Sequence, residues 1–369
     1  MDILLTLALF VPLLLILWVA NLAERKRVET LVDSAREPTG DLVRKSASNS
    51  ARVLSLIAYT ALVVLYGLAM LFGLLFQGLG WLAQSSASGF AVSLQTRGLD
   101  PAALPEMGMA LWLPALLGLI LLLPPVRRWF GHWISGFDSR SPVHAVALSY
   151  ISLILVNLLF TLAVGLDTLA GMLESEAAAG IQFNPTGGIW AQDVTLAIMA
   201  VIGVGWLARR GLGLALARLG IVVPTWRQTL VGLGVGLLMA PVALLVEFLA
   251  GLVGFGENPD VARLTEQMIG PLMTSAPGIL TLGLAAALGE ESIFRGALQP
   301  RFGLILTSLL FALVHSNYGL SFSTLLVFLI GLILGLLRRR FNTTTAMLAH
   351  ATYNMSLGVI TFLGLLQNM

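Results

Sequence analysis

Long apolar runs constrain the fold of this chain more than any other feature of its sequence. A helix needs about 20 apolar residues to cross the ~30 Å hydrocarbon core of a bilayer. The chain is 57% hydrophobic and 11% charged, whereas roughly a quarter of the residues in a soluble domain are charged. We therefore predict an all-α, polytopic transmembrane helix bundle with about ten spans. The runs lie at residues 2–22, 54–83, 108–124, 144–172, 190–207, 228–254, 275–300, 303–317, 321–337 and 343–366.

Basic residues alternate between the loops that join these runs. The loops with few basic residues hold only Arg97 and Arg263, and they carry acids such as Glu174 and Asp260. Cytoplasmic loops of membrane proteins are enriched in Lys and Arg, so this alternation predicts that both termini lie outside. The basic loops contain Arg25, Lys26, Arg27, Arg36, Arg44, Lys45, Arg52, Arg127, Arg128, Arg140, Arg209, Arg210, Arg218, Arg227, Arg301, Arg338, Arg339 and Arg340.

Composition also limits the chemistry. The chain has no cysteine, which excludes disulfides, thiol nucleophiles and thiolate metal sites. Nothing in the charge pattern indicates nucleic-acid binding. A cysteine-free chain rich in Leu, Ala and Gly is typical of an integral protein of a prokaryotic plasma membrane, and this is the location we predict.

We predict two parts, an N-terminal transmembrane helical module at 1–208 and a C-terminal part at 209–369 that carries the polar motifs. The first run is too long for a signal-peptide core and lacks a basic segment before it, so we interpret it as a retained helix. Residues 23–53 are predicted to be a polar cytoplasmic loop, in part helical. Residues 209–224 mix arginines with apolar residues and are predicted to contain a helix in the membrane interface.

Two pairs of glycines are spaced one helical turn apart within predicted spans. They are Gly232 with Gly236, and Gly331 with Gly335. Small residues at this spacing allow the backbones of neighbouring helices to approach closely. We therefore predict close helix packing at both pairs.

The stretch LAAALGEESIFRGALQPRFG places Glu290, Glu291 and Arg295 within an apolar run. In a helix, Glu291 and Arg295 share a face and can pair, whereas Glu290 lies ~100° further round. A buried carboxylate without a cation is pushed toward its neutral form by desolvation. Glu290 is thus the carboxylate available for chemistry, and the alternative is a purely structural ion cluster.

The chain has four histidines. His132 and His144 lie in or beside a basic loop and are predicted to be interfacial. His315 and His350 lie in apolar runs, and Asn354 follows His350 by one turn. Glu290, His315 and His350 are each ten to twelve residues from the predicted cytoplasmic end of their run, or about 15–18 Å deep. Their common depth indicates one site rather than three independent polar contacts.

Three motifs on successive predicted helices, Glu290-Glu291-x-x-x-Arg295, Phe311-x-x-x-His315 and His350-x-x-x-Asn354, resemble the CPBP family. This family contains CAAX prenyl endopeptidases, bacteriocin-processing proteins and related intramembrane proteases, and is also called the ABI family. The resemblance covers roughly residues 210–366. It implies hydrolysis of peptide bonds within or beside the membrane, with a peptide or membrane-protein substrate taken from the bilayer.

The motif residues suit activation of water. Without cysteine, and without a serine placed beside a histidine base, a covalent nucleophile is not indicated. Glu290 is the predicted general base, and His315 and Asn354 are predicted donors to a developing oxyanion. His350 is predicted to orient the water or to bind a metal. Glu291 paired with Arg295 is predicted to fix the helix and the base.

Two mechanisms remain open on these residues. Glu290, His315 and His350 form an acceptable ligand set for a divalent metal such as Zn²⁺, with a position left for water. A metal-free glutamate mechanism fits the same residues, because Asn is a poor zinc ligand and a good hydrogen-bond donor.

Two other functions stay open as alternatives. A non-proteolytic scaffold or immunity protein of the same family would retain the site without using it. An ion-coupled transporter would use further acids within its spans, for which Glu247 and Asp167 are the candidates. The sequence distinguishes neither prenylated from leader-type substrates nor one oligomeric state from another.

Overall fold

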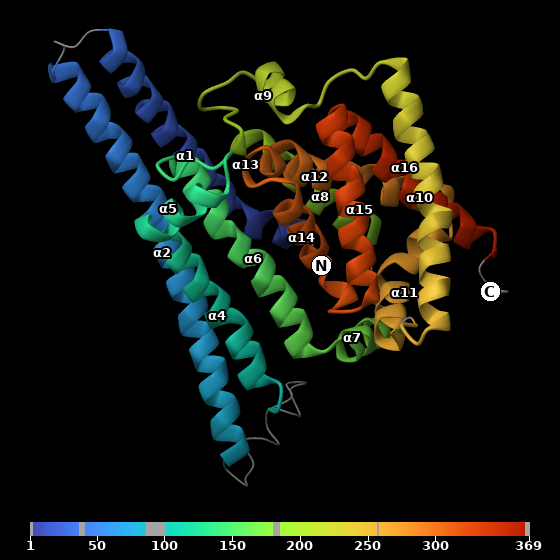
Figure 1. Cartoon of the computed structure of the whole chain (residues 1–369). Coiled ribbons are helices and arrows are strands. Elements are labelled where there is room, and N and C mark those ends of the chain that lie inside the picture. The colour runs from blue at the N-terminus through green and yellow to red at the C-terminus, as the bar shows by residue number, and fades with distance from the viewer. Residues whose placement is uncertain (1–2, 37–40, 86–100, 180–184, 257, 366–369) are drawn as a thin grey trace.

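The structure is a computed structural model that describes residues 3–36, 41–85, 101–179, 185–256 and 258–365. Every regular element in these ranges is a helix, and an isolated bridge joins Trp206 to Arg210. Figure 1 shows the helices as one bundle. The predicted all-α, polytopic class is confirmed.

The N-terminal hairpin is more helical than its sequence predicted. Helices α1 (Ile3–Arg36) and α2 (Asp41–Ser85) pack side by side, and their upper ends in Figure 1 extend beyond the other helices. The segment 23–53 was predicted to be a polar loop, in part helical; the helical part is confirmed, and the described residues 23–36 and 41–53 are helical throughout. Glu29 forms ion pairs of 2.8 Å with Arg25 and with Lys26, and pairs three and four residues apart stabilise a helix beyond its apolar part.

The next six helices complete the predicted N-terminal module and lead out of it. They are α4 (Leu104–Leu122), α5 (Pro124–Trp133), α6 (Pro142–Val164), α7 (Leu166–Ala178), α8 (Pro185–Gly203) and α9 (Leu212–Leu219). The predicted run 144–172 is interrupted at Gly165, whose φ of +89° suits glycine and ends α6. Helix α9 lies within the segment predicted to form an interfacial helix.

After α9, most of the described C-terminal part consists of the helices that carry or flank the motifs. They are α10 (Trp226–Leu252), α11 (Pro259–Met273), α12 (Ala276–Glu291), the π-helix η1 (Ser292–Leu298), α13 (Gln299–Phe302), α14 (Leu304–Val314), α15 (Phe322–Arg340) and α16 (Thr343–Phe362). A short 3₁₀ turn, η2 (Ser316–Tyr318), follows α14. Helices α11 and α12 are bent by 113° at the break between them.

Seven described helices are long and apolar enough to cross a membrane, or up to eight spans if the bent pair α11 and α12 counts as one. The predicted number of about ten is therefore too high by this measure. Helix α14 has 11 residues and extends only ~16 Å, about half of a bilayer core. Helix α16 has 20 residues but is not among the seven, since it carries threonines, His350 and Asn354.

Both glycine pairs lie at close helix contacts, as predicted. A Cβ on Gly236 of α10 would lie 2.4 Å from the Ala349 carbonyl oxygen of α16. A Cβ on Gly335 of α15 would lie 2.3 Å from Leu304 Cδ1 and 3.0 Å from Gln299 Oε1. Only glycine permits these distances, so the two pairs set how near α16 and α15 come to their neighbours.

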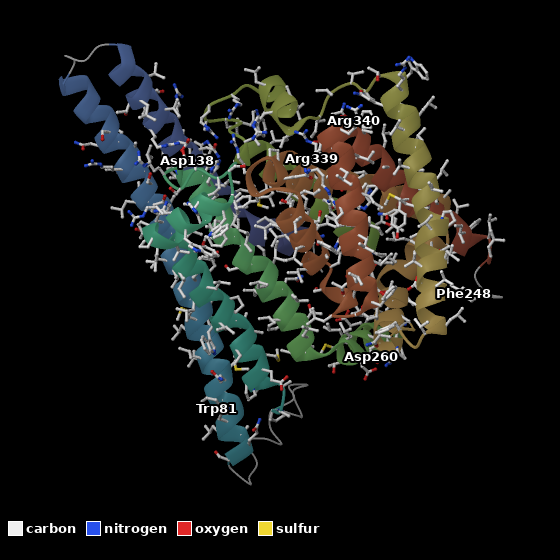
Figure 2. All side chains as sticks on the ribbon, in the orientation of Figure 1. Trp81, Asp138, Phe248, Asp260, Arg339 and Arg340 are labelled. Atoms are coloured by element: carbon white, nitrogen blue, oxygen red, sulfur yellow. The ribbon has the colours of Figure 1, made fainter. Side chains whose placement is uncertain are left out.

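Charged groups gather at the two ends of the bundle. Figure 2 shows Asp138, Arg339 and Arg340 toward one end and Asp260 toward the other. Arg27 of α1 pairs with Asp138 and with Glu24, both at 2.7 Å. This separation agrees with the predicted alternation of basic and acidic loops, and the orientation of the termini in a membrane stays a prediction.

The acidic end contains an exposed ion cluster. Arg263 of α11 pairs with Asp167 and Glu174 of α7. The hydrogen bond from Arg263 lowers the pKa of the exposed Glu174 carboxyl below its usual value. Asp167 is thus tied to an outer ion pair and does not reach into the bundle.

Candidate active site

The first motif lies where α12 ends and the helix widens into η1. Helix α12 begins at Ser275, whose hydroxyl accepts a hydrogen bond from the Gly278 N–H, and it ends at Glu291. The next seven residues form the π-helix. Such π-turns are rare and occur frequently at functional sites. Ser292 donates its hydroxyl to the Leu288 carbonyl at 2.6 Å, so this serine is committed to its own helix.

Glu291 is the structural carboxylate of the pair. Its side chain is 0% exposed, and its Oε1 lies 3.0 Å from Arg295 Nη1 and 2.9 Å from His350 Nδ1. The predicted pairing of Glu291 with Arg295 is therefore present. Because Arg295 neutralises the carboxylate, Glu291 accepts a hydrogen bond from His350 Nδ1–H, and Nε2 carries the lone pair of that imidazole. His350 is thereby fixed to Glu291 rather than to Glu290.

Arg295 is held on three sides although it is 1% exposed. Besides Glu291, its Nη2 donates to the Gly331 carbonyl at 3.3 Å, and its guanidinium lies 4.0 Å from the centre of the Phe311 ring. A cation over an aromatic face gains further electrostatic stabilisation in a dry site. These contacts join η1, α14 and α15 around one buried charge.

Glu290 has a different environment from its neighbour. Its Oε1 lies 3.8 Å from His315 Nε2, which is longer than a hydrogen bond. Its Oε2 is buried and has no hydrogen-bond partner. The Glu290 and His315 side chains are 14% and 22% exposed. Among the described residues, nothing donates a hydrogen bond to Glu290, so it keeps its lone pairs available.

The tautomer of His315 follows from its backbone contact. Its Nδ1 lies 2.7 Å from the Phe311 carbonyl oxygen. A carbonyl can only accept, so Nδ1 carries the hydrogen and Nε2 of the neutral ring faces Glu290 with a lone pair. This limits the predicted oxyanion role of His315, because Nε2 can donate only from the protonated imidazolium.

Phe311 lies at the centre of the cluster. Its ring meets those of His315 and His350 edge-on, with centroids 4.9 Å and 5.9 Å away. Tyr318 stacks on the far side of His315 at 6.0 Å. The predicted packing of Phe311 against the imidazole is confirmed, and the same ring spaces the two histidines apart.

Asn354 contacts neither the Glu290–His315 pair nor the Glu291–His350 pair. Its Nδ2 donates to the Leu282 carbonyl of α12 at 3.2 Å. Leu282 precedes Glu290 by eight residues, or ~12 Å along a helix. In this arrangement Asn354 joins α16 to α12, and its Nδ2 keeps a second N–H for a role as oxyanion donor.

The remaining histidines lie outside the cluster. His144 Nδ1 accepts a hydrogen bond from the Asp138 backbone N–H at 2.8 Å. His132 packs its ring edge-on to Trp133. The two histidines flank the loop between α5 and α6.

The predicted metal ligands have suitable tautomers but not a closed ligand set. His315 and His350 both donate Nδ1–H to an oxygen and keep Nε2 as an electron-pair donor, as metal-binding histidines do. In the part of the chain that the structure describes, however, no group of three or more His, Asp or Glu side chains is placed to hold a metal ion. We derive no step through a metal, and ligation by Glu290, His315 and His350 stays a prediction.

Asp193 of α8 is a site residue that the sequence analysis missed. It is 2% exposed, and its Oδ1 has no hydrogen-bond partner. The charge of Glu290 acts electrostatically on Asp193. The signal was present, because a lone aspartate inside an apolar run is an intramembrane ionisable group, which is functional by default.

Helix α6 of the N-terminal module supports the His315 turn. Asn157 donates to Ser316 Oγ at 2.9 Å and to the Val314 carbonyl at 3.3 Å, and Thr161 lies 3.0 Å from Ser316 Oγ. Helices α6 and α8 thus contact the motif helices directly. These contacts join the two parts that we predicted on either side of residues 208 and 209. The division into two domains stays a prediction.

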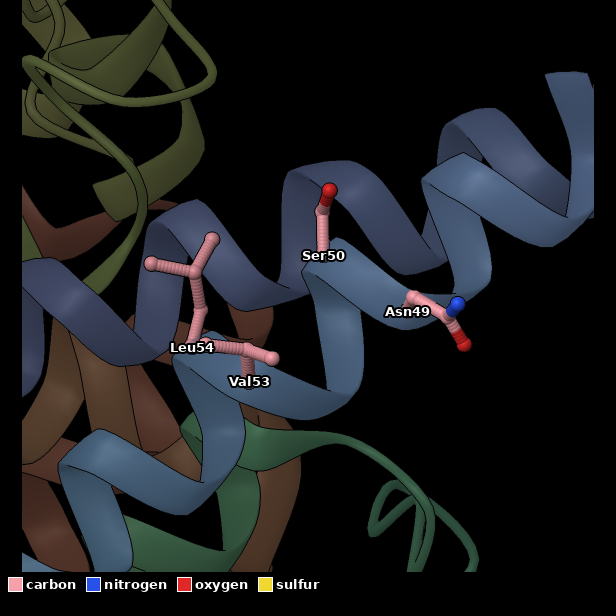
Figure 3. A pocket seen from close by; sticks show the side chains of 4 residues that line it. All are labelled: Asn49, Ser50, Val53 and Leu54. Atoms are coloured by element: carbon pink, nitrogen blue, oxygen red, sulfur yellow. The ribbon is translucent and has the colours of Figure 1, made fainter.

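Two hollows lie elsewhere. One, of about 700 Å³, is lined by Asn49, Ser50, Val53 and Leu54 of α2 (Figure 3). The other, of about 400 Å³, lies between α10 and α16 and is mostly apolar. Neither lining includes Glu290, His315 or His350.

Glu247, the other acid considered for a transporter, lies half-buried on α10 and acts electrostatically on Tyr353 of α16. Asp167 is held by Arg263 at the outer end. The structure does not join these two acids into one ion site.

Comparison with known families agrees with the resemblance seen in the motifs. Residues 272–356 match the family model described as type II CAAX prenyl endopeptidase Rce1-like, which is consistent with the CPBP family. The matched segment runs from the end of α11 into α16 and includes all seven motif residues. No curated protein and no solved structure matches the chain.

Proposed function

We propose that this integral membrane protein is an intramembrane endopeptidase in which Glu290 activates water. The observation that carries the proposal is the contrast within one Glu–Glu pair. One oxygen of each carboxylate lacks a partner, but Glu291 is fixed through its other oxygen by Arg295 and His350, whereas Glu290 accepts no hydrogen bond among the described residues and faces His315 at 3.8 Å. A buried acceptor without a partner is expensive unless it has a function. The match to a CAAX-type protease family supports the same conclusion.

The hydrolysis balances on these residues. Glu290 removes a proton from water, and the oxygen of that water bonds to the carbonyl carbon of the scissile peptide. The C–N bond then breaks, and the proton on Glu290 passes to the leaving amine. His315 Nε2, opposite Glu290, donates to the oxyanion when the ring is protonated. Asn354 supplies a second donor through the Nδ2 hydrogen that the Leu282 carbonyl does not use.

The surroundings indicate the substrate class only broadly. We propose a peptide or membrane-protein segment that enters from the bilayer, with prenylated and leader-type peptides both included. The proposed setting is a prokaryotic plasma membrane with both termini outside, as the loop charges predict.

Reconstituted protein tests the proposal. Wild type in proteoliposomes should cleave members of a panel of prenylated, leader-type and transmembrane peptides. Glu290→Gln should lower turnover by ~10²–10⁴, because Gln keeps the volume but cannot accept the proton. Near-normal cleavage by this variant would remove Glu290 from the role of base. Ion-coupled uptake by wild type without cleavage would instead favour the transporter, and neither activity would favour the scaffold.

Metal content is a separate measurement. Elemental analysis of the purified protein, combined with turnover before and after chelation, decides between metal-bound and metal-free water. Stoichiometric zinc whose removal abolishes cleavage would support the metal-bound alternative.

A further inference from the structure

Asp193 is a buried acid whose place in the fold has no structural explanation. It lies where α8 crosses α12, directly against Gly289, the residue before Glu290. A Cβ on Gly289 would be 2.6 Å from both the Asp193 Cα and its carbonyl oxygen. One turn before Asp193, Trp190 donates its Nε1–H to Thr281 Oγ1 of α12 at 3.1 Å. Asp193 is therefore rigidly placed beside the proposed base.

Neither acid of this pair has a hydrogen-bond donor among the described residues. Asp193 Oδ1 and Glu290 Oε2 are both buried and unpartnered. Glu291 Oε2 is unpartnered as well, but Arg295 balances its charge at 3.0 Å. Asp193 has no such cation.

The charged groups around Asp193 are few. Glu290 acts on it from α12, while Arg295 of η1 and His315 at the end of α14 act on Glu290. Helices α1, α9 and α11 also pack on α8, but their described residues exert no resolved electrostatic effect on Asp193. Two adjacent carboxylates that only accept repel each other unless a donor lies between them.

We propose that Asp193 and Glu290 hold the hydrolytic water between them, each carboxylate accepting one of its two O–H bonds. A water molecule offers two donors, and buried waters usually satisfy otherwise unpaired polar groups in this way. Asp193 is then the residue that orients the attacking water, and it comes from outside the segment that matches the family model. This inference rests on the proposed hydrolytic function.

The proton count is unchanged by the second carboxylate. The O–H bond directed at Glu290 breaks, and its proton moves to Glu290. The oxygen forms its new bond to the peptide carbon while its second hydrogen stays in place, directed at Asp193. Glu290 then returns its proton to the leaving amine.

The test uses full-length protein and a peptide that wild type cleaves. Asp193→Leu removes both acceptor oxygens while keeping the branch at Cγ and should lower kcat by ~10²-fold, the typical effect of misplacing a reacting group. KM should stay within about twofold of wild type, because the interaction is with water rather than with substrate. Asp193→Asn keeps one acceptor oxygen and should recover about tenfold of the lost kcat, as expected for a weaker neutral acceptor.

Two controls separate orientation of water from a structural role. Asp260→Asn makes the same chemical change at an exposed position of α11 and should retain wild-type kcat. Melting temperatures of all variants are measured, and Asp193→Asn should match wild type. If Asp193→Leu does not fold, Asp193→Ala replaces it, since alanine adds no volume against Gly289, with the same expected loss of kcat.

The outcomes also separate this inference from the proposed function. If wild type cleaves no peptide, both fail. If wild type cleaves and Glu290→Gln does not, but Asp193→Leu keeps kcat within about threefold of wild type, only the water-orienting role of Asp193 is wrong. A loss carried by KM, or equal losses of kcat in the Leu and Asn variants, would also overturn it.

Discussion

The two halves of the polar cluster differ in what surrounds their carboxylates. On one side, Glu291 contacts Arg295 and His350 and is 0% exposed. On the other side, Glu290 and Asp193 have unpartnered oxygens, and the nearest imidazole, that of His315, is 3.8 Å away. The first arrangement satisfies a charge and holds helices together. The second leaves acceptors free, which stabilises nothing by itself and suits proton transfer.

The comparison shows how two identical side chains, adjacent in sequence, acquire separate roles. Successive residues of a helix point ~100° apart. Glu291 therefore faces α16 and Arg295, whereas Glu290 faces α8 and the end of α14. Each role depends on what the neighbouring helix offers, and the following predictions perturb those neighbours one at a time.

The largest expected effect on stability comes from removing the cation of the structural side. Arg295→Ala leaves Glu291 buried without its counter-ion, which should cost ~3–5 kcal/mol of unfolding free energy. A marked fall in melting temperature of the purified variant checks this. Arg339→Ala, at an exposed arginine of α15, is the matched control and should melt with wild type. An unchanged melting temperature for Arg295→Ala, with turnover lost, would mean that Arg295 contacts substrate.

A smaller effect is expected from disturbing the crossing of α8 and α12. Gly289→Ala places a methyl group 2.4–2.6 Å from atoms of Asp193, so the two helices must separate. Overpacking of this kind typically costs ~1–3 kcal/mol. Turnover should fall as well, because Asp193 moves relative to Glu290. Gly234→Ala of α10, with open space at its Cβ, should leave both unchanged.

Equal melting temperature and equal turnover of Gly289→Ala and Gly234→Ala would contradict the close contact of α8 with α12 at Gly289. It would show that α8 does not hold its position against the base, and the two sides of the cluster would then differ less than the structure indicates.

The smallest effect is expected at the support of His315. Asn157→Ala removes the side-chain bonds to Ser316 and Val314, at a cost of ~1 kcal/mol. Turnover should fall modestly, with little change in melting temperature, because only the turn after α14 loosens. Asn49→Ala, at an exposed position of α2, gives the baseline. A melting change as large as that of Arg295→Ala would show that this turn is part of the structural side.

Much of this arrangement was predictable from sequence, and the exceptions have physical causes. Apolar run length and composition predict the helices. The spacing of Glu291 and Arg295 predicts their ion pair, which forms although a π-helix follows Glu291. Neither pattern reports which helices are neighbours. The link between His350 and Glu291, and the position of Asp193 against Gly289, depend on tertiary packing between segments far apart in the chain.

The span count failed for a related reason. Hydropathy does not reveal the bend between α11 and α12 or the shortness of α14, and the polar residues that bring α16 into the site also lower its apolarity. The segment 23–53 is more helical than predicted, and ion pairs along α1 support helix where the apolar signal has ended.

One paired measurement tests the division of roles most directly. Turnover and melting temperature are compared for Glu290→Gln and Glu291→Gln, which make the same change at adjacent positions. Glu290→Gln should lose ~10²–10⁴ in turnover and melt with wild type, because its carboxylate has no structural partner to lose. Glu291→Gln should lose ~3–5 kcal/mol of stability, because Arg295 is left buried and unpaired. A destabilised Glu290→Gln together with a Glu291→Gln that melts normally would contradict the account.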